Sequence, residues 1–287
     1  MAGGVIPVTR FAPSPTGLLH LGHAYSALLA FEQAKSQNGT FLLRIEDIDQ
    51  PRCKPEFEQA IYDDLTWLGL TWPTPVMRQS DRRTAYDAAL NRLTEMGLTY
   101  PCSCTRGDIR AALSAPQEGA PMIGPDGPIY PGTCRDLPPR APKDTDAIRL
   151  NIARAADHLG TQNLTFTETG PIHTGTHDID PNALPDTVGD IVLARRDIGT
   201  SYHIAVTVDD ASQGVTTVTR GADLFAATTV HVLLQRLLGL PTPTYHHHDL
   251  IRDDTGKRLA KRDDARAIAK YRADGATPAD IRAMVGL

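Results

Sequence analysis

The sequence has few cysteines, no long apolar run and no excess of basic charge, and each absence excludes a class of protein. Four cysteines in 287 residues are too few for a disulfide-stapled secreted scaffold, so we expect a reducing, cytoplasmic compartment. No run of 18 apolar residues occurs, which predicts a protein without a membrane span. The first residues lack the basic flank and apolar core of a signal peptide. A net charge of −5 argues against a dedicated nucleic-acid coat, although a local basic patch still permits RNA binding.

Alternating strand and helix patterns predict a soluble α/β protein with a parallel sheet. A short strand over 5–11 precedes a helical pattern over 22–37, and a buried strand follows over 41–45. The other predicted helices cover 56–68, 81–96 (with Ser80 as N-cap), 224–238, 264–272 and 278–285, and the other predicted strands cover 147–152, 190–195 and 202–208.

A proline-rich stretch that contains three of the four cysteines interrupts this pattern over 101–145. We expect an irregular insertion there, organised by a metal. The predicted parts are a first half of the catalytic domain (1–100), an insertion and subdomain (101–187, with the metal-binding part at 102–134), a second catalytic half (188–245), and a basic loop with a short helical tail (246–287).

The segment from Arg10 to His23 has the chemistry of a phosphate-binding turn. It places prolines and a glycine between the first strand and the first helix, where backbone N–H groups and the helix dipole favour negative charge. His20 and His23 lie three residues apart and are able to donate hydrogen bonds to the same phosphoryl group. The alternative is a plain connection with two surface histidines. A zinc site is disfavoured because no third ligand lies nearby.

The segment 256–262, Gly-Lys-Arg-Leu-Ala-Lys-Arg, is a basic loop near the C-terminus. On its own it is typical of a solvated charged loop. Residues 251–272 carry eight Lys or Arg against four Asp, which makes this region our candidate for salt-sensitive contact with RNA phosphates.

In this order, the two segments resemble the HIGH and KMSKS signatures of the class I aminoacyl-tRNA synthetases. The segments 44–49, 79–82, 202–210 and 220–223 are similar to the glutamyl/glutaminyl subgroup, so the resemblance spans nearly the whole chain. It implies a Rossmann-type parallel sheet with a zinc-containing insertion and a short helical C-terminal region. One departure is Ala260, which stands where the signature loop usually has serine and so removes one hydroxyl donor.

The resemblance also implies the site residues. It assigns catalysis to His20, His23 and Lys261, and ATP binding to His20, Gly22, His23, Arg258, Leu259, Ala260, Lys261 and Arg262. It assigns glutamate binding to Arg10, Phe11, Ala12, Pro13, Ser14, Glu46, Tyr202 and Arg220.

The chemistry of these residue types fits a dicarboxylic amino acid. Arg10 and Arg220 supply cations for two carboxylates, Glu46 supplies an anion for the ammonium group, and Tyr202 adds a phenolic hydroxyl. The alternative for Glu46 and Arg220 is a structural ion pair. We interpret Asp209 and Asp210 as strand-end carboxylates that cap a turn or orient the pocket.

Cys102, Cys104 and Cys134 offer three thiolates for a structural Zn²⁺, which needs four ligands. The chemistry leaves the fourth open, and three reduced cysteines in a loop remain the alternative. Relatives with Cys-x-Cys and Tyr-x-x-x-Cys imply Tyr130 as the fourth ligand of one zinc per chain. We expect Cys53 to be an inert thiol and His246–His248 to be structural.

Only 25 residues follow the basic loop, which we expect to leave no room for the anticodon-binding domains of a full glutamyl enzyme. Truncated paralogues of that enzyme imply an ATP-dependent, glutamyl-adenylate-forming ligase. It activates L-glutamate without tRNA, with Mg²⁺ accompanying ATP. It then transfers glutamate to the queuosine base in the anticodon loop of tRNA-Asp. We expect a monomer.

Three alternatives stay open. A minimal glutamyl-tRNA synthetase would charge a tRNA 3′ end. A non-enzymatic RNA-binding paralogue would be expected to lose His20, His23 or Lys261, all of which are present. A ligase that attaches glutamate to a small molecule would share the same site.

Overall fold

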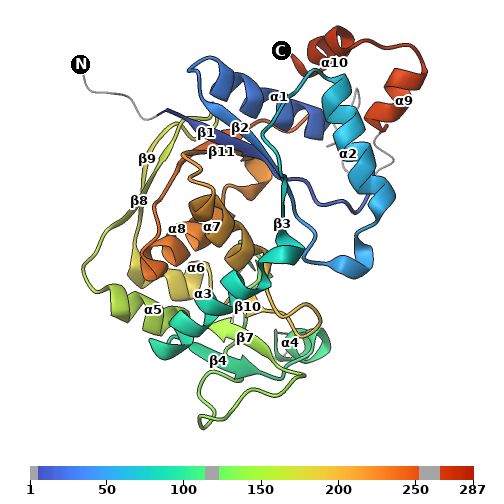
Figure 1. Ribbon diagram of the computed structural model, residues 1–287. Coiled ribbons are helices and arrows are strands. Elements are labelled where there is room, and N and C mark those ends of the chain that lie inside the picture. The colour runs from blue at the N-terminus through green and yellow to red at the C-terminus, as the bar shows by residue number, and fades with distance from the viewer. Residues whose placement is uncertain (1–5, 114–122, 252–265) are drawn as a thin grey trace.

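The computed structural model describes residues 6–113, 123–251 and 266–287. A parallel sheet crosses the upper part of the molecule, and a smaller antiparallel sheet lies below it (Figure 1).

The parallel sheet is built from two groups of strands whose edges meet. β1 (Val8–Phe11), β2 (Thr40–Ile45) and β3 (Met77–Arg78) pair in that order, all parallel. β11 (Thr217–Gly221), β12 (Thr244–His248), β8 (Leu164–Glu168) and β9 (Gly175–Ile179) form the second group, in which only β9 is antiparallel. β1 and β11 lie side by side, and the N–H of Thr216 donates to the carbonyl of Val8 at 2.9 Å. The carboxyl ends of four parallel strands, β1, β2, β11 and β12, therefore face one region.

Helices cover both faces of this sheet because its strands are apolar on both sides. α1 (Leu21–Lys35) packs on one face with Phe41 and Leu43 of β2. On the other face lie α3 (Arg83–Glu95), α7 (Tyr202–Ser212) and α8 (Ala227–Leu238), which share a second core with Leu42 of β2. The alternation along β2 thus divides the hydrophobic core between two layers.

The insertion is more regular than its composition predicts. β4 (Thr99–Cys102), β7 (Ala147–Leu150) and β10 (Val192–Ala194) form an antiparallel sheet, and β5 (Ile123–Gly124) pairs with β6 (Gly127–Pro128) in a small hairpin. The described elements of the central region also include α4 (Arg106–Leu113), α5 (Ile152–Leu159), α6 (Leu184–Thr187) and the 3₁₀ turns Gln50–Arg52, Gln79–Arg82, Pro181–Ala183 and Ala222–Leu224.

The C-terminal helices return to the N-terminal half. α9 (Ile268–Ala273) and α10 (Pro278–Val285) pack with α1 and α2 (Pro55–Trp67), and the guanidinium of Arg282 meets the carboxylate of Glu32 at 3.0 Å. Ile268 and Ile281 are buried in the same core as α1. The short helical tail predicted from the sequence is confirmed.

Two local predictions are wrong. Residues 202–208 form the first turns of helix α7, not a strand, and Asp209 and Asp210 lie on this helix rather than at a strand end. The hydroxyl of Ser201 caps the helix by accepting the N–H of Ile204 at 3.4 Å. Ser80 does not cap α3, because its hydroxyl donates to Asp47 at 2.7 Å and a 3₁₀ turn precedes the helix.

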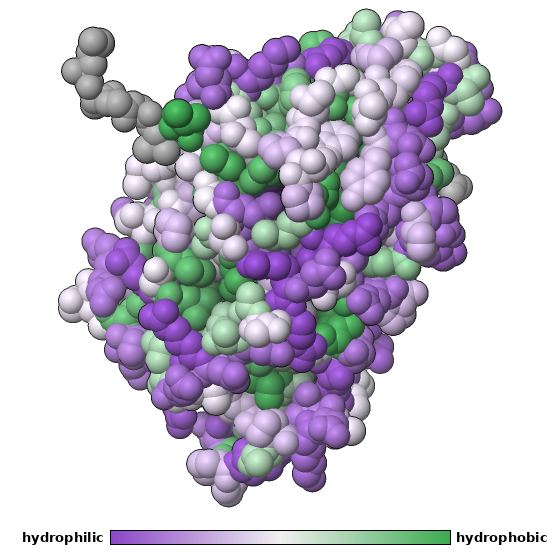
Figure 2. All heavy atoms as spheres, in the orientation of Figure 1, coloured by the Kyte–Doolittle hydropathy of each residue, from purple (hydrophilic) through white to green (hydrophobic). Residues whose placement is uncertain are grey.

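The surface drawn in Figure 2 intersperses hydrophilic and hydrophobic residues. Within the described ranges, no helix is both long enough and apolar enough to cross a membrane.

Candidate active site at the strand ends

A cavity of about 440 Å³ opens at the carboxyl ends of the parallel strands. Ligands of open parallel sheets bind in such a position, where neighbouring strands connect to opposite sides. Nine residues predicted from the sequence line it: Arg10, Phe11, Ala12, His20, Gly22, His23, Glu46, Tyr202 and Arg220. Segments more than 200 residues apart therefore meet in one pocket, as the predicted site requires.

The remaining predicted residues are placed differently. Ser14 lines an adjoining cavity of about 190 Å³ that shares Glu46 and Tyr202 with the first. The carbonyl of Pro13 accepts the N–H of Glu46 at 3.0 Å and so ties the turn after β1 to the end of β2. Arg258, Leu259, Ala260, Lys261 and Arg262 lie outside the described residues.

The chain on both sides of the basic segment reaches the cavity. Leu250 and Ile251 line it directly. On the other side, Ala267 forms an isolated bridge with His20, and the N–H of Ile268 donates to the carbonyl of Leu19 at 2.9 Å. Both flanks of 252–265 are thus fixed beside the histidine turn.

His20 and His23 cap the N-terminus of α1 with their Nδ1 atoms. His20 Nδ1 accepts the N–H of Gly22 at 3.1 Å, and His23 Nδ1 accepts the N–H of His20 at 3.2 Å. A neutral imidazole that accepts at Nδ1 carries its hydrogen on Nε2. The glycine keeps this arrangement open, since a Cβ at Gly22 would lie 3.1 Å from Cε1 of His20. The two rings lie 3.8 Å apart and present Nε2 donors at a positive helix end.

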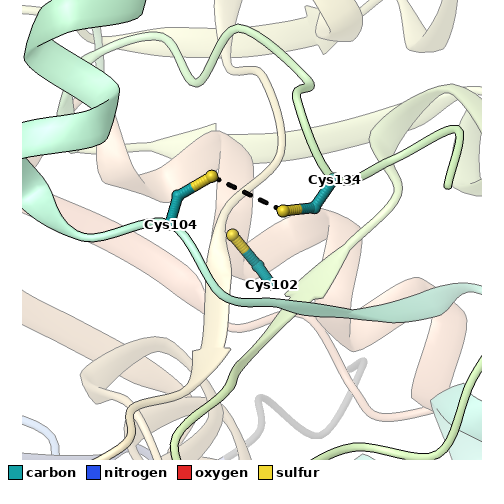
Figure 3. A group of neighbouring side chains, drawn as sticks. All are labelled: Cys102, Cys104 and Cys134. Atoms are coloured by element: carbon teal, nitrogen blue, oxygen red, sulfur yellow. Dashed lines mark hydrogen bonds between the residues drawn. The ribbon is translucent and has the colours of Figure 1, made fainter.

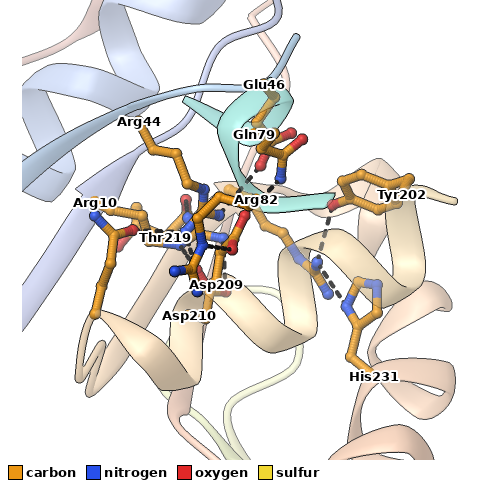
Figure 4. Close-up of polar contacts among 12 residues, drawn as sticks. Arg10, Arg44, Glu46, Gln79, Arg82, Tyr202, Asp209, Asp210, Thr219 and His231 are labelled. Atoms are coloured by element: carbon orange, nitrogen blue, oxygen red, sulfur yellow. Dashed lines mark hydrogen bonds and ion pairs between the residues drawn. The ribbon is translucent and has the colours of Figure 1, made fainter. Parts of the chain in front are cut away.

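A buried charge cluster lies beneath the cavity, with Asp210 of α7 at its centre (Figure 4). Its carboxylate meets Nε of Arg10 at 3.0 Å and Nη1 of Arg44 at 2.7 Å. Arg44 also contacts Glu46 at 3.1 Å. Burial alone would raise the pKa of Asp210, but the two arginines outweigh it and hold the pKa below its usual value. Asp210 therefore stays ionised and orients both guanidinium groups.

Asp209, the neighbour of Asp210, orients the other side of α7. It is fully buried and accepts hydrogen bonds from Gln79 at 3.1 Å, Arg82 at 3.2 Å and Tyr86 at 2.7 Å. Two residues of the segment 79–82, which the sequence analysis singled out, thus hold Asp209 in place on α7. The predicted role in orienting the pocket fits both aspartates, although their place on a helix was not foreseen.

Glu46 does form a structural ion pair, but its partner is the guanidinium of Arg44, and no ion pair between Glu46 and Arg220 occurs among the described residues. Burial raises the pKa of the Glu46 carboxyl, against the opposing effect of Arg44 and Arg10. Burial likewise raises the pKa of Tyr202, which keeps its phenol protonated. The cavity therefore offers a carboxyl group, a hydroxyl donor and two arginines from four different elements.

Cys102, Cys104 and Cys134 converge, with all three sulfur atoms within 4.8 Å of one another (Figure 3). The Sγ atoms of Cys104 and Cys134 are 3.5 Å apart, near the separation of two thiolates on one tetrahedral zinc, about 3.8 Å. The Tyr130 hydroxyl lies 3.4 Å from Sγ of Cys102 and 3.3 Å from Sγ of Cys104. It also accepts the N–H of Cys134 at 2.9 Å, and the Arg149 guanidinium lies 3.8 Å from its ring centroid. Burial and the neighbouring sulfur atoms raise the pKa of the Tyr130 phenol, so this residue would lose its proton only to a bound metal. The convergence of three thiols and one hydroxyl group fits the four ligands of a zinc ion.

Eight residues that line the cavity were not among the predicted site residues: Ser26, Thr219, Gly221, Asp223, Leu224, His248, Leu250 and Ile251. His248 was predicted to be structural, yet its Nε2 lies 2.6 Å from the hydroxyl of Ser26 at the cavity wall. Thr219 and His248 lie on β11 and β12, neither of which is among the strands predicted from the sequence. Nothing in the local pattern indicates Ser26, which is one turn of α1 beyond His23.

Comparison with known proteins agrees with this geometry. The family model for the catalytic domain of class I tRNA synthetases (E and Q) matches residues 7–287. A glutamyl-Q tRNA(Asp) synthetase from Rhodobacter capsulatus is 61% identical over 284 residues, covering 98% of this chain and 100% of the relative. One from Nocardia farcinica is 42% identical, covering 96% and 82%. A solved glutamate tRNA ligase from Elizabethkingia meningosepticum, in complex with its amino acid, has a TM-score of 0.75 at 27% identity, covering 98% of this chain and 60% of that one.

These matches define a catalytic domain of the class I synthetase type, an ATP-dependent ligase. The chain belongs to the class I tRNA synthetase (E and Q) family, in the group of the glutamyl-Q tRNA(Asp) synthetases. The resemblance to this family, the class I fold with its parallel sheet and the prediction of an enzyme are confirmed.

Proposed function

We propose that this enzyme activates L-glutamate with ATP and transfers it to the queuosine base at the wobble position of tRNA-Asp. One observation carries the first half: a single cavity joins the imidazole pair at the N-terminus of α1 to Arg220, Glu46 and Tyr202. The side chains that would donate hydrogen bonds to phosphate and those that would bind the amino acid thus face the same cavity. The names of the similar proteins support the acceptor.

In the first step, an α-carboxylate oxygen of glutamate attacks the α-phosphorus of ATP. The bond from that phosphorus to the bridging oxygen breaks, and pyrophosphate leaves with the charge. His20 and His23 donate from Nε2 to phosphoryl oxygens, where each preorganised donor contributes roughly 3 kcal/mol. Lys261, which lies outside the described residues, is our candidate for the cation that binds the departing pyrophosphate. ATP would enter with Mg²⁺, whose charge shields the triphosphate.

The two arginines differ in what they already bind. Asp210 contacts Arg10 directly, whereas Arg220 donates to neutral groups. A carboxylate entering the cavity therefore gains more at Arg220, which we assign to one carboxylate of glutamate. Glu46 accepts the ammonium group, and Ser14 faces the adjoining space that shares Glu46 and Tyr202.

In the second step, a hydroxyl oxygen of queuosine attacks the acyl carbon of glutamyl-adenylate. The acyl–phosphate bond breaks, and AMP leaves as its phosphate takes up the hydroxyl proton. The adjoining cavity of about 190 Å³ opens on Glu46 and Tyr202 and includes Arg52 and Arg195 at its wall. Arginines at this position suit the phosphates of an anticodon loop.

The deciding experiment supplies ATP and labelled glutamate with tRNA-Asp, with and without queuosine, and with tRNA-Glu. We expect label only on queuosine-bearing tRNA-Asp, and glutamate-dependent ATP–pyrophosphate exchange without any tRNA. Label on tRNA-Glu would instead identify a minimal charging enzyme. Adenylate without label on any tRNA would indicate a small-molecule acceptor.

The cysteine cluster holds a structural zinc in this proposal, bound by Cys102, Cys104, Cys134 and Tyr130. Replacing Cys134 by serine is expected to remove close to one zinc per chain, because a thiolate ligand is lost. Metal analysis of the purified protein measures this, and limited proteolysis reports exposure of 102–134. Cys53→Ser, which removes the cysteine outside the cluster, is the control. Equal zinc in Cys134→Ser and the wild type would contradict the site.

A further inference from the structure

Arg220 is buried and holds its guanidinium among neutral acceptors. Nε donates to Nε2 of His247 at 3.0 Å, Nη1 donates to Nδ1 of His231 at 3.1 Å, and Nη2 donates to the hydroxyl of Thr228 at 2.9 Å. Nη1 also donates to the hydroxyl of Tyr202, at the longer distance of 3.5 Å. Of the five N–H groups of a guanidinium, one on Nη2 therefore remains for a ligand, and the long bond to Tyr202 is the one that a ligand would replace.

The contacts of Arg220 fix the direction of a chain of hydrogen bonds. A guanidinium only donates, so Nδ1 of His231 accepts and its Nε2 carries the hydrogen. That hydrogen points to Nδ1 of His203 at 3.1 Å. Nε2 of His203 then donates to both carboxylate oxygens of Asp126 at 2.9 Å. The order Arg220, His231, His203, Asp126 is the one in which every donor meets an acceptor.

A second, shorter chain runs the other way from Arg220. His247 accepts from Arg220 at Nε2, and its Nδ1 lies 2.5 Å from the carboxylate of Glu168. Glu168 is held in turn by the N–H groups of Gly170 at 2.6 Å and His247 at 2.8 Å. The carboxylates of Asp126 and Glu168 are thus connected to Arg220 only through the imidazoles of histidine residues.

Both imidazoles next to Arg220 remain neutral at neutral pH. Burial and the charge of Arg220 lower the pKa of His231 well below its usual value. The same two effects lower the pKa of His247 to about 4, despite the opposing influence of Glu168. The guanidinium therefore keeps its full charge toward the cavity, in contrast to Arg10 and Arg44, which contact the carboxylate of Asp210.

We propose that Asp126, His203 and His231 form a positioning relay that holds Arg220 ready for a carboxylate and against an amide. A carboxylate accepts the unused N–H group of Nη2 and the N–H group that Nη1 directs at Tyr202, whereas an amide offers one oxygen and sets its own NH₂ group against the second donor. Asp126 holds the hydrogen of His203 on Nε2, and so favours from the other end the same tautomer of His231 that Arg220 requires. Without Asp126, the opposing tautomer, which places a hydrogen on Nδ1 of His231 against Arg220, is disfavoured from one end only.

Asp126 belongs to the turn between β5 and β6, four residues before Tyr130. Its side chain is 52% exposed, whereas His203 and His231 are buried. The relay therefore connects the insertion that carries the cysteine cluster to the amino-acid pocket of the catalytic domain. This inference rests on the proposed use of glutamate.

Titration calorimetry with glutamate and with glutamine tests the relay in the intact protein. Asp126→Ala is expected to weaken glutamate binding about fivefold, the effect of one net hydrogen bond, with glutamine binding changed less than about twofold. Asp126→Glu is expected to restore the wild-type ratio of the affinities for glutamate and glutamine. Asp178→Ala, which removes an exposed carboxylate from β9, is the matched control and should leave the ratio unchanged.

The outcomes separate the relay from the proposed function. A wild-type protein that binds no glutamate would overturn both. Glutamate binding by the wild type with the same preference in Asp126→Ala would overturn the relay alone, as would an equal loss in Asp178→Ala. Imidazole ¹⁵N shifts give a readout besides binding: Nδ1 of His203 and His231 should be unprotonated in the wild type, and a hydrogen on either would contradict the relay.

Discussion

Replacing Arg220 by glutamine is expected to lower kcat/KM for glutamate in ATP–pyrophosphate exchange by roughly 100- to 1,000-fold. Removing one member of a buried, hydrogen-bonded charge pair costs about 2–5 kcal/mol. Arg220 is 6% exposed and has a charge that no contacting carboxylate in the described part of the chain balances, so a carboxylate of the substrate depends on it. Arg220→Lys keeps the charge but loses the planar fork, and an intermediate loss is expected.

The matched control for this prediction is Arg236→Gln on α8. Arg236 is exposed, and its guanidinium reaches only the carbonyl of Asn163, at 3.5 Å, among the described contacts. Its exchange activity should stay within about twofold of the wild type, since surface changes are usually near neutral. Thermal unfolding of each variant separates lost binding from lost structure. A well-folded Arg220→Gln enzyme with nearly wild-type kcat/KM would remove Arg220 from the site.

Asp210→Asn is expected to destabilise the fold by about 3–5 kcal/mol, because it leaves Arg10 and Arg44 buried with one carboxylate fewer. For a chain of this size, such a loss lowers the melting temperature by about 5–8 °C. Differential scanning calorimetry measures it. Asp87→Asn breaks an exposed pair with Arg83 and should change stability by less than about 1 kcal/mol.

The difference in stability between the wild type and Asp210→Asn depends on pH in a defined direction. The pKa of Asp210 is lower in the folded protein than its usual value, so its ion pairs add stability above the unfolded pKa of about 3.9. That contribution is lost as the pH falls through the lower, folded pKa. The stability gap between wild type and Asp210→Asn should therefore be constant near neutral pH and shrink in acid. A gap that widens in acid would contradict an ionised Asp210.

The sequence by itself determined the elements whose patterns are local. Helices α1 and α2 and strands β1 and β2 lie within a few residues of their predicted ranges, because capping residues, glycines and apolar periodicity act over short distances. Helix α7 was mistaken for a strand because most of its residues are buried, among them Ile204, Ala205 and Val206. Such a helix lacks an amphipathic period and is read as a buried strand.

Motif order along the chain was enough to predict the cavity lining at Arg10, His20, His23, Glu46, Tyr202 and Arg220. Only the tertiary structure decided how their charges are arranged. Asp210 binds Arg10 while neutral histidines bind Arg220, and Asp126 reaches His203 from 77 residues away. Ion pairs and hydrogen-bond direction depend on distance and burial, which no spacing in the sequence encodes.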